Sequence, residues 1–362
     1  MKKPDYLLLL GIVIISLFGV LMIYSSSYVW AEYKFDDAFK FVKTQSLFLF
    51  VGYILMYFIL KVPYTKYLDK SNFIFISCII LLILVLIPGI GTVRNGSRSW
   101  FGIGGFGIQP SEFTKLSLII FTSKYLSYNE KSIKDIKKGL LPILLVLILV
   151  FGLIMLQPDF GTGMIIVVSI IGLLFVSGVP MNFFIKLGLL GLLGIVGLII
   201  IAPYRMKRIV SFLNPWSDPL GSGFQIIQSL YAIGPGGLLG LGFGNSIQKH
   251  FYLPEPQTDF IFAIISEEFG VMGILIVASI FILIIYRGFR IAINCENKFG
   301  KYLAFGITFQ LAFQCLLNLM VVVGLIPVTG VTLPFLSYGG SSLLITMLSM
   351  SILLNISKYN YE

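Results

Sequence analysis

The sequence predicts an all-α, polytopic membrane protein of about ten transmembrane helices, with one large, partly helical loop on the outer face between helices 7 and 8. The 362 residues are 57% hydrophobic and only 12% charged, and the mean hydropathy is +0.96. A soluble domain is typically about 25% charged, so most of this surface must face lipid. The apolar residues also fall into segments long enough to cross a bilayer.

Ten apolar segments of roughly 18 to 27 residues follow one another, and a helix of that length crosses about 30 Å of hydrocarbon. The first segment follows two lysines and has no small-residue cleavage site, so we expect a span and not a signal peptide. Residues 1–362 are therefore expected to form a single membrane domain. The segments begin near Tyr6, Thr44, Ser71, Pro110, Gly139, Gly161, Asn182, Phe260, Tyr302 and Ser337.

Basic residues predict the orientation, because cytoplasmic loops carry an excess of Lys and Arg. With the N-terminus inside, about 16 of the 26 Lys and Arg residues are cytoplasmic and about nine are outside, while Lys115 lies within a span. Both termini are therefore expected in the cytoplasm. The net charge of +10 follows from this excess, and no nucleic-acid-binding motif accompanies it. One histidine and three unpaired cysteines predict neither a metal site nor a disulfide framework.

The outer loop at about 204–258 is too long to be an ordinary connection. A structureless loop of this length is improbable unless it is functional or disordered. Its aromatic residues argue against disorder. We therefore expect the loop to fold back on the helix bundle, with short helices around 222–233.

Two charged residues, Glu112 and Lys115, lie three apart in the fourth span. A charge inside a span costs about 2.5–3.5 kcal/mol on insertion scales, so each needs a reason to be there. Two readings are open at this point. The residues could form a mutual ion pair that stabilises the helix, or they could belong to a functional site.

Asp259 lies where the long loop meets the eighth span, in the stretch QTDFIFAIISEEFG. It could cap the helix N-terminus, a role that Thr258 could also serve. It could instead be a carboxylate base at the outer membrane surface. The pattern alone slightly favours the cap.

Basic residues also occur on the predicted outer face, against the usual bias. Arg205, Lys207 and Arg208 follow the seventh span. They could place their charges at the lipid interface, or they could bind phosphate, since the guanidinium group fits phosphate oxygens. Arg94 and Arg98 invite the same comparison.

Five stretches of the sequence resemble the SEDS family (shape, elongation, division and sporulation), which includes the FtsW, RodA and SpoVE proteins. They occur in the family's order and span most of the chain. The stretches are NGSRSWFGIGGFGIQPSEFTKL (95–116), QPDFGTG (157–163), RIVSFLNPWSDPLGSGFQIIQSLYAIGPGG (208–237), QKHFYLPEPQTDFIFAIISEEFG (248–270) and GLIPVTGVTLPFLSYGGSS (324–342).

The resemblance implies a bacterial peptidoglycan glycosyltransferase that polymerises lipid II, a disaccharide-pentapeptide on undecaprenyl pyrophosphate, at the outer face of the plasma membrane. It implies Asp259 as the catalytic residue. Many members carry Arg before the tryptophan where this chain has Ser99, so the basic role there falls to Arg98. A Mg²⁺ or Mn²⁺ ion could help neutralise the pyrophosphate, but the sequence contains no metal-ligand cluster. The expected substrate-binding residues are Arg98, Glu112, Lys115, Arg205, Arg208 and Lys249.

The wording of several motifs is closer to the FtsW and SpoVE branch than to RodA, which favours division or sporulation over a RodA-type elongation polymerase. The family implies a class B penicillin-binding protein, a transpeptidase, as partner, with other division or sporulation membrane proteins and no nucleic acid. Two other functions fit a membrane protein with polar residues in its spans and outer loops. It could be a flippase that moves lipid II across the membrane, or a non-enzymatic scaffold for wall synthesis.

Overall fold

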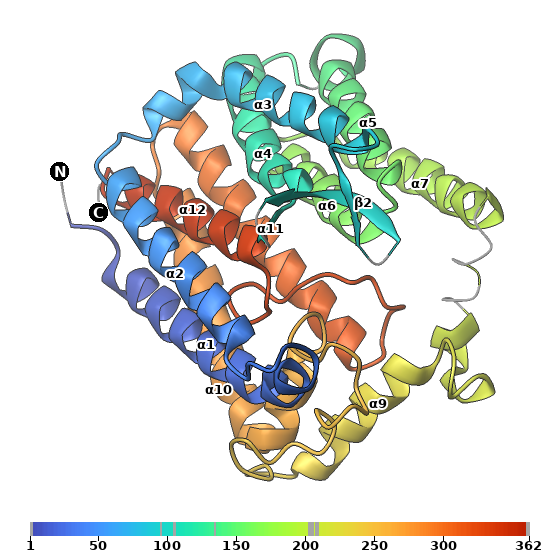
Figure 1. Ribbon diagram of the computed structural model, residues 1–362. Coiled ribbons are helices and arrows are strands. Elements are labelled where there is room, and N and C mark those ends of the chain that lie inside the picture. Colours follow the sequence, from blue (N-terminus) through green and yellow to red (C-terminus); the bar gives the residue numbers. More distant parts are fainter. Residues whose placement is uncertain are drawn as a thin grey trace.

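The computed structural model describes residues 3–94, 96–103, 106–133, 135–201, 206 and 210–359. In this part of the chain, ten long helices match the ten predicted segments in order, which confirms the helical membrane fold (Figure 1). They are α1 (Tyr6–Phe35), α2 (Lys40–Ile59), α3 (Thr65–Leu86), α4 (Pro110–Asn129), α5 (Leu141–Met155), α6 (Phe160–Val176), α7 (Met181–Ile201), α10 (Ile261–Ile293), α11 (Lys298–Val322) and α12 (Gly340–Ser357).

Seven helices are long and apolar enough to cross a membrane by their length and composition, where α5 counts together with the helical turn η1 (Ile136–Leu140) before it. Helices α6 and α7 contribute shorter apolar stretches. Helix α4 is different because it carries Glu112, Lys115 and Lys124. It packs against α3, α6, α11 and α12, and 13 of its 20 residues are buried. A helix surrounded by other helices need not present an apolar face to lipid, which is why α4 tolerates these charges.

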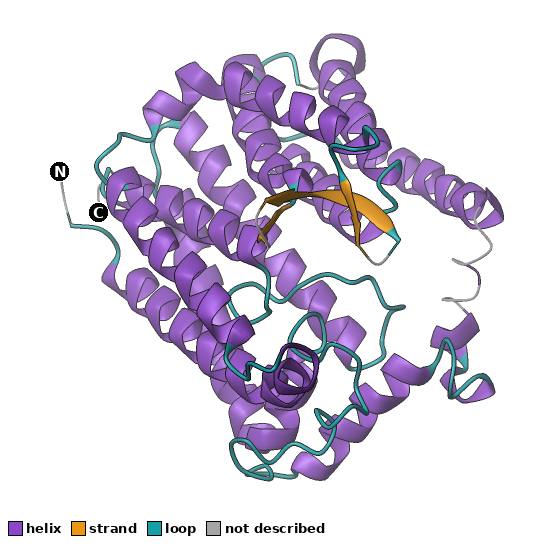
Figure 2. Ribbon diagram, in the orientation of Figure 1, coloured by secondary structure: helices purple, strands orange, loops and turns teal. Residues whose placement is uncertain are grey.

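A small antiparallel sheet lies between α3 and α4, and the sequence analysis did not predict it (Figure 2). Its strands are β1 (Thr92–Arg94), β2 (Ser97–Ile103) and β3 (Phe106–Ile108), in the order β1-β2-β3. Arg94 pairs with Ser97 across the first turn, and Gly96 has a positive φ of 79°. Glycine suits this position, because it adopts positive φ without steric cost, and an Asn-Gly sequence between two strands is a strong hairpin signal.

The long loop is partly helical, as predicted. It contains the short turns η2 (Pro215–Ser217) and η3 (Gly234–Gly236) on either side of helix α9 (Phe224–Ile233). Helix α9 packs against α10 and α11. Its bounds agree with the short helices expected around 222–233.

Helix α10 is interrupted at Gly270, where φ is 60° and ψ is −156°. The loop segment 237–242 supplies main-chain hydrogen bonds at this break. The Leu241 amide donates to the Glu267 carbonyl at 2.9 Å, and the Val271 amide donates to the Gly237 carbonyl at 2.9 Å. The loop and the upper part of α10 are therefore joined through their backbones.

The segment between α11 and α12 approaches α1 closely. A Cβ atom at Gly19 of α1 would overlap the carbonyl oxygen of Phe335. Glycine at this position therefore lets the segment 327–339 lie directly against α1. In Figure 1 both chain termini lie at one end of the bundle, whereas the sheet, the α11–α12 segment and the loop with α9 lie away from them.

Candidate active site

A cavity of about 650 Å³ opens among the sheet, the end of the long loop and the α11–α12 segment. Aromatic side chains line part of it and polar side chains line the rest, so it can hold a ligand that is partly apolar and partly charged. The charged residues that line it are Arg94, Glu112, Lys115, Asp159, Glu255 and Asp259.

Asp259 is held at the edge of the cavity by its neighbours in the chain and by α11. The Thr258 hydroxyl lies 3.0 Å from Asp259 Oδ1 and 2.7 Å from the Glu255 carbonyl oxygen. The Asn318 amide donates to the Asp259 carbonyl oxygen at 2.7 Å. The N-cap residue of α10 is Phe260 and not Asp259, so Asp259 does not have the capping role that the sequence left open.

The sequence left open whether Glu112 and Lys115 form an ion pair or belong to a functional site, and the structure shows an ion pair that faces the cavity. Lys115 Nζ lies 2.9 Å from Glu112 Oε2 and donates to Gln314 Oε1 at 3.0 Å. Gln314 in turn donates to the Thr332 carbonyl at 2.9 Å. Both charged side chains are almost fully buried, with 2% and 8% of their surface exposed for Lys115 and Glu112.

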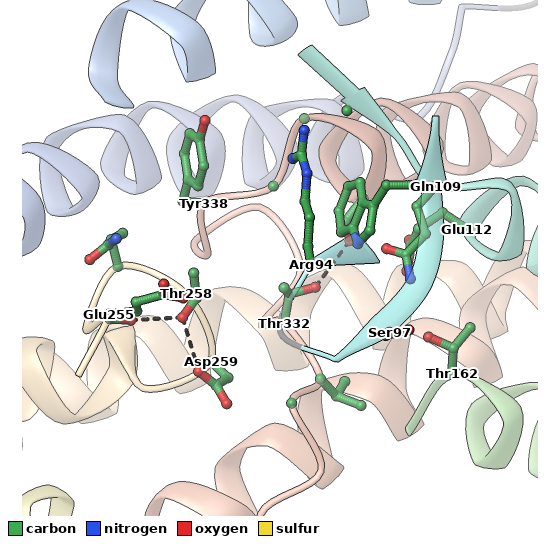
Figure 3. A pocket seen from close by; sticks show the side chains of 18 of the residues that line it. Arg94, Ser97, Gln109, Glu112, Thr162, Glu255, Thr258, Asp259, Thr332 and Tyr338 are labelled. Atoms are coloured by element: carbon green, nitrogen blue, oxygen red, sulfur yellow. Dashed lines mark hydrogen bonds between the residues drawn. The ribbon is translucent and has the colours of Figure 1, made fainter. Parts of the chain in front are cut away.

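Figure 3 shows the arrangement of the polar side chains around this cavity. Thr258 and Asp259, from the end of the loop, lie on one side. Gln109 and Glu112, from the start of α4, lie on the other, and Arg94 extends from the sheet toward the same space. Segments that are far apart in sequence thus bring several carboxylates, the Glu112–Lys115 ion pair and a guanidinium group to a common cavity.

Arg98, the basic residue expected from this segment, is not among the residues that line the cavity. Its Nη1 atom lies 3.5 Å from the Leu86 carbonyl oxygen at the C-terminal end of α3. A cation is stabilised there by the helix dipole. Arg94, on the neighbouring strand, occupies the cavity instead. The reason is strand alternation, since Arg98 pairs with Val93 and Arg94 pairs with Ser97.

Lys249 is also expected to bind substrate, yet it lies away from this cavity in a buried cluster. Its Nζ atom lies 3.0 Å from Glu268 Oε1, and neither side chain is exposed to solvent. The same amine donates to the Gly244 carbonyl at 2.6 Å. Lys249 therefore connects the loop to α10. The other basic residues predicted for the site, Arg205 and Arg208, lie outside the described residues, as does the neighbouring Lys207.

Asp159 is a cavity residue that the sequence analysis missed as a site residue, although it lies in the matched stretch QPDFGTG. Its carboxylate accepts hydrogen bonds from the Thr162 amide at 3.1 Å and from Gln109 Nε2 at 2.9 Å. Burial raises the pKa of the Asp159 carboxyl, and the Thr162 amide opposes this rise. Only its position at the start of α6 could have drawn attention to it, as a helix cap.

Within the described residues there is no group of three or more His, Cys, Asp or Glu side chains that could hold a metal ion. A Mg²⁺ or Mn²⁺ ion on the pyrophosphate of the ligand stays a prediction from the resemblance.

Comparison with known proteins places the whole chain in one family. Residues 5–362 match the model of the FtsW/RodA/SpoVE family of cell cycle proteins. The chain is 53% identical to stage V sporulation protein E of Bacillus subtilis over 358 residues, which covers 99% of this chain and 98% of that protein. It is 42% identical to the "Probable peptidoglycan glycosyltransferase FtsW" of a Geobacter species over 353 residues, covering 98% and 96% of the two chains.

Solved structures agree with the sequence comparisons. A chain from a peptidoglycan synthase complex that coordinates polymerization and crosslinking is similar, with a TM-score of 0.82, 30% identity and 99% of each chain covered. The rod shape determining protein RodA of Thermus thermophilus has a TM-score of 0.73 at 26% identity, with 99% of this chain and 98% of that chain covered. These matches confirm the multi-pass helical fold and the expected likeness to SpoVE and FtsW, and the chain belongs to the FtsW/RodA/SpoVE (SEDS) family.

Proposed function

We propose that this protein is a peptidoglycan glycosyltransferase that polymerises lipid II into glycan strands. The observation that carries the proposal is the cavity shared by Asp259, the Glu112–Lys115 pair and Arg94. The substrate is half lipid and half polyanion. The cavity is partly aromatic, and it holds the cations Arg94 and Lys115 among four acidic residues, so it can contact both halves. Relatives that cover nearly the whole chain carry the glycosyltransferase name.

The proposed reaction inverts the anomeric carbon, because the donor linkage to pyrophosphate is α and the new glycosidic bond is β-1,4. The 4-hydroxyl of the acceptor sugar attacks that carbon and passes its proton to Asp259. The bond to pyrophosphate breaks, and its electron pair stays on the departing undecaprenyl pyrophosphate. Direct displacement of this kind needs one base and a stabilised leaving group, and no covalent nucleophile. One carboxylate with nearby cations is therefore sufficient.

The Glu112–Lys115 pair supplies a positive amine at a fixed position in the cavity wall. Because Lys115 also donates to Gln314, which is itself held by the Thr332 carbonyl, the amine has a defined direction. A buried pair of this kind is retained at a cost in desolvation, which fits a role in binding better than a role in stability alone. We propose that Lys115 contributes to binding the anionic part of the substrate and that Glu112 holds Lys115 in place.

A lipid II flippase is the strongest alternative, and the shape of the interior argues against it. A flippase needs a passage that continues from one face of the membrane to the other. Beyond Lys115, the void between α11 and α12 measures only about 10 Å³. That volume is about what one water molecule needs, so among the described residues this void is no passage for a lipid headgroup in this conformation.

Purified protein tests the function directly. The protein is mixed with lipid II in detergent, without a bilayer, and the products are separated by size. We expect glycan polymer, which cannot arise from transport because no second compartment exists. A purified, folded protein that leaves lipid II unchanged, alone and with its cognate transpeptidase, would contradict the proposal and favour the flippase or the scaffold.

We further propose that the protein lies in the bacterial plasma membrane with both termini in the cytoplasm and the cavity on the outer face. The Lys and Arg asymmetry supports this orientation. Single cysteines at residues 131 and 220, in a background without Cys78, Cys295 and Cys315, test it with a membrane-impermeant thiol reagent. We expect Leu220→Cys to react in intact cells and Lys131→Cys to react only after lysis. The reverse pattern would overturn the orientation.

The proposed setting is wall synthesis in division or sporulation, with a class B penicillin-binding protein as the crosslinking partner. The likeness to stage V sporulation protein E and to FtsW supports the setting. The likeness to a chain of a complex that combines polymerization and crosslinking supports the partner.

A further inference from the structure

We propose that Arg94 binds the pyrophosphate group of the lipid-linked donor and stabilises it as it leaves. This inference rests on the proposed function, since it assigns one ligand group within the same cavity. It concerns a residue of the sheet between α3 and α4.

The first support is the place of Arg94 in the sheet. It is the last residue of β1, and it lines the cavity together with Lys115 and Asp259. The other arginine of this sheet, Arg98, points instead to the Leu86 carbonyl at the end of α3. The hairpin register therefore delivers one of the two guanidinium groups to the cavity and keeps the other outside it.

The second support is that the sheet itself fixes the position of the guanidinium group. Its Cζ atom lies 5.2 Å from the centroid of the Trp100 ring, a cation–π distance. A Cβ atom on Gly107 of β3 would lie 2.6 Å from Arg94 Nη1 and 2.9 Å from the Trp100 ring. Any side chain at Gly107 would thus compete with the arginine for the same space. Glycine at this position lets the guanidinium group lie against the backbone of β3.

The third support is the charge around it. Lys115, the other cation of the cavity, already has Glu112 at 2.9 Å. Among the described residues, Arg94 has no acidic side chain at ion-pairing distance, and it is exposed toward the cavity. Its charge also opposes the rise in the pKa of Tyr338 that burial causes. A guanidinium group with a stacked face and available N–H groups is suited to two phosphate oxygens at once.

The test compares Arg94→Gln with Arg98→Gln, which makes the same charge change in the same sheet outside the cavity. We expect Arg94→Gln to lower kcat/KM for lipid II polymerisation by about 10–100-fold, the range for losing hydrogen bonds to a charged group. Arg98→Gln should stay within about threefold. Arg94→Lys keeps the charge but loses the planar pair of N–H donors, so its kcat/KM should lie between those of wild type and Arg94→Gln.

A binding measurement makes the result independent of catalysis. Undecaprenyl pyrophosphate is titrated into purified protein in detergent, and its Kd is compared with that of undecaprenyl monophosphate. Arg94→Gln should weaken binding of the pyrophosphate by about 10-fold, and the monophosphate should lose less. If the wild type makes no polymer but shows this pattern, the proposed function fails and the binding assignment stands. If the wild type polymerises lipid II and Arg94→Gln behaves like Arg98→Gln, the assignment of Arg94 fails and the proposed function stands.

Two further experiments test the position of the guanidinium group and the identity of the anion that it binds. Gly107→Ala should displace the guanidinium group and reduce activity, whereas in the Arg94→Gln background it should add little, because the displaced group is already absent. Fully additive losses would contradict the stacked arrangement. Lipid II without its stem peptide tests for peptide carboxylates. If the Arg94→Gln defect vanishes with this substrate, the arginine binds the peptide and the pyrophosphate assignment is overturned.

Discussion

Asp259→Asn is expected to abolish lipid II polymerisation while leaving the protein folded and inserted. The substitution keeps the size of the side chain and removes the base that takes the proton of the attacking hydroxyl. General base catalysis typically contributes about 10²–10⁴-fold, so the residual rate should be at most about one hundredth of the wild-type rate. Because the N-cap position of α10 is Phe260, loss of this carboxylate should not weaken the start of the helix.

The measurement is the rate of glycan polymer formation by purified protein, with thermal unfolding and lipid II binding recorded on the same samples. Glu130→Gln is the matched control, since Glu130 is an exposed carboxylate that does not line this cavity. We expect Glu130→Gln to keep most of its activity. Near wild-type polymerisation by Asp259→Asn would show that the proton goes elsewhere, and Asp159 would then be the carboxylate to examine.

Lys249→Met is expected to cause the largest loss of stability, about 3–5 kcal/mol. It removes the only cation that neutralises Glu268 in the described structure and leaves that carboxylate buried. The Ser25 hydroxyl lies 2.6 Å from Glu268 Oε1 and would still donate to it, but a hydroxyl does not replace a positive charge. The loop would then be held to α10 mainly through its backbone, so polymerisation should fall as well.

Thermal unfolding in detergent compares this variant with Lys298→Met, which breaks the exposed pair between Lys298 and Glu130. An exposed pair contributes little, so Lys298→Met should unfold near the wild-type temperature. A second variant, Lys249→Met combined with Glu268→Leu, removes both charges and should recover much of the lost stability. Equal melting temperatures for Lys249→Met and Lys298→Met would show that the buried pair does not hold the loop.

The sequence predicted the helices well because their signal is local. Each segment is a continuous apolar stretch, and its approximate position follows from the composition of that stretch alone. The lengths were predicted less well, because α1 (30 residues) and α10 (33 residues) exceed the expected 18 to 27 residues, and α5 (15 residues) and α6 (17 residues) are shorter. Even α4, which carries three charged residues, was identified through its apolar middle. The folded nature of the long loop also followed locally, from its aromatic residues and its length.

The sequence could not predict contacts that depend on register or on distant partners. Arg94 and Arg98 are equally basic, and only the pairing of β1 with β2 decides which one reaches the cavity. Lys249 was expected to bind substrate, whereas its partner, Glu268, is known only from the fold. For Glu112 and Lys115, the helical spacing allowed an ion pair but did not decide between it and a functional site. Their further partner Gln314 comes from α11, and the cavity that they face is formed by distant segments.

The break at Gly270 divides α10 into two parts, and only one of them is needed to cross the membrane. At 1.5 Å per residue, the full helix of 33 residues would be about 50 Å long, far more than the hydrocarbon thickness. The continuous part after the break, residues 271–293, is about 35 Å long, which is long enough to cross the bilayer by itself. The residues before the break are then not needed to cross the hydrocarbon and can serve as a support for the long loop. Glu267 and Glu268 lie in this part of α10, and both are buried against the loop, where Ser246 and Ile247 donate to Glu267 and Lys249 pairs with Glu268, so neither carboxylate faces lipid.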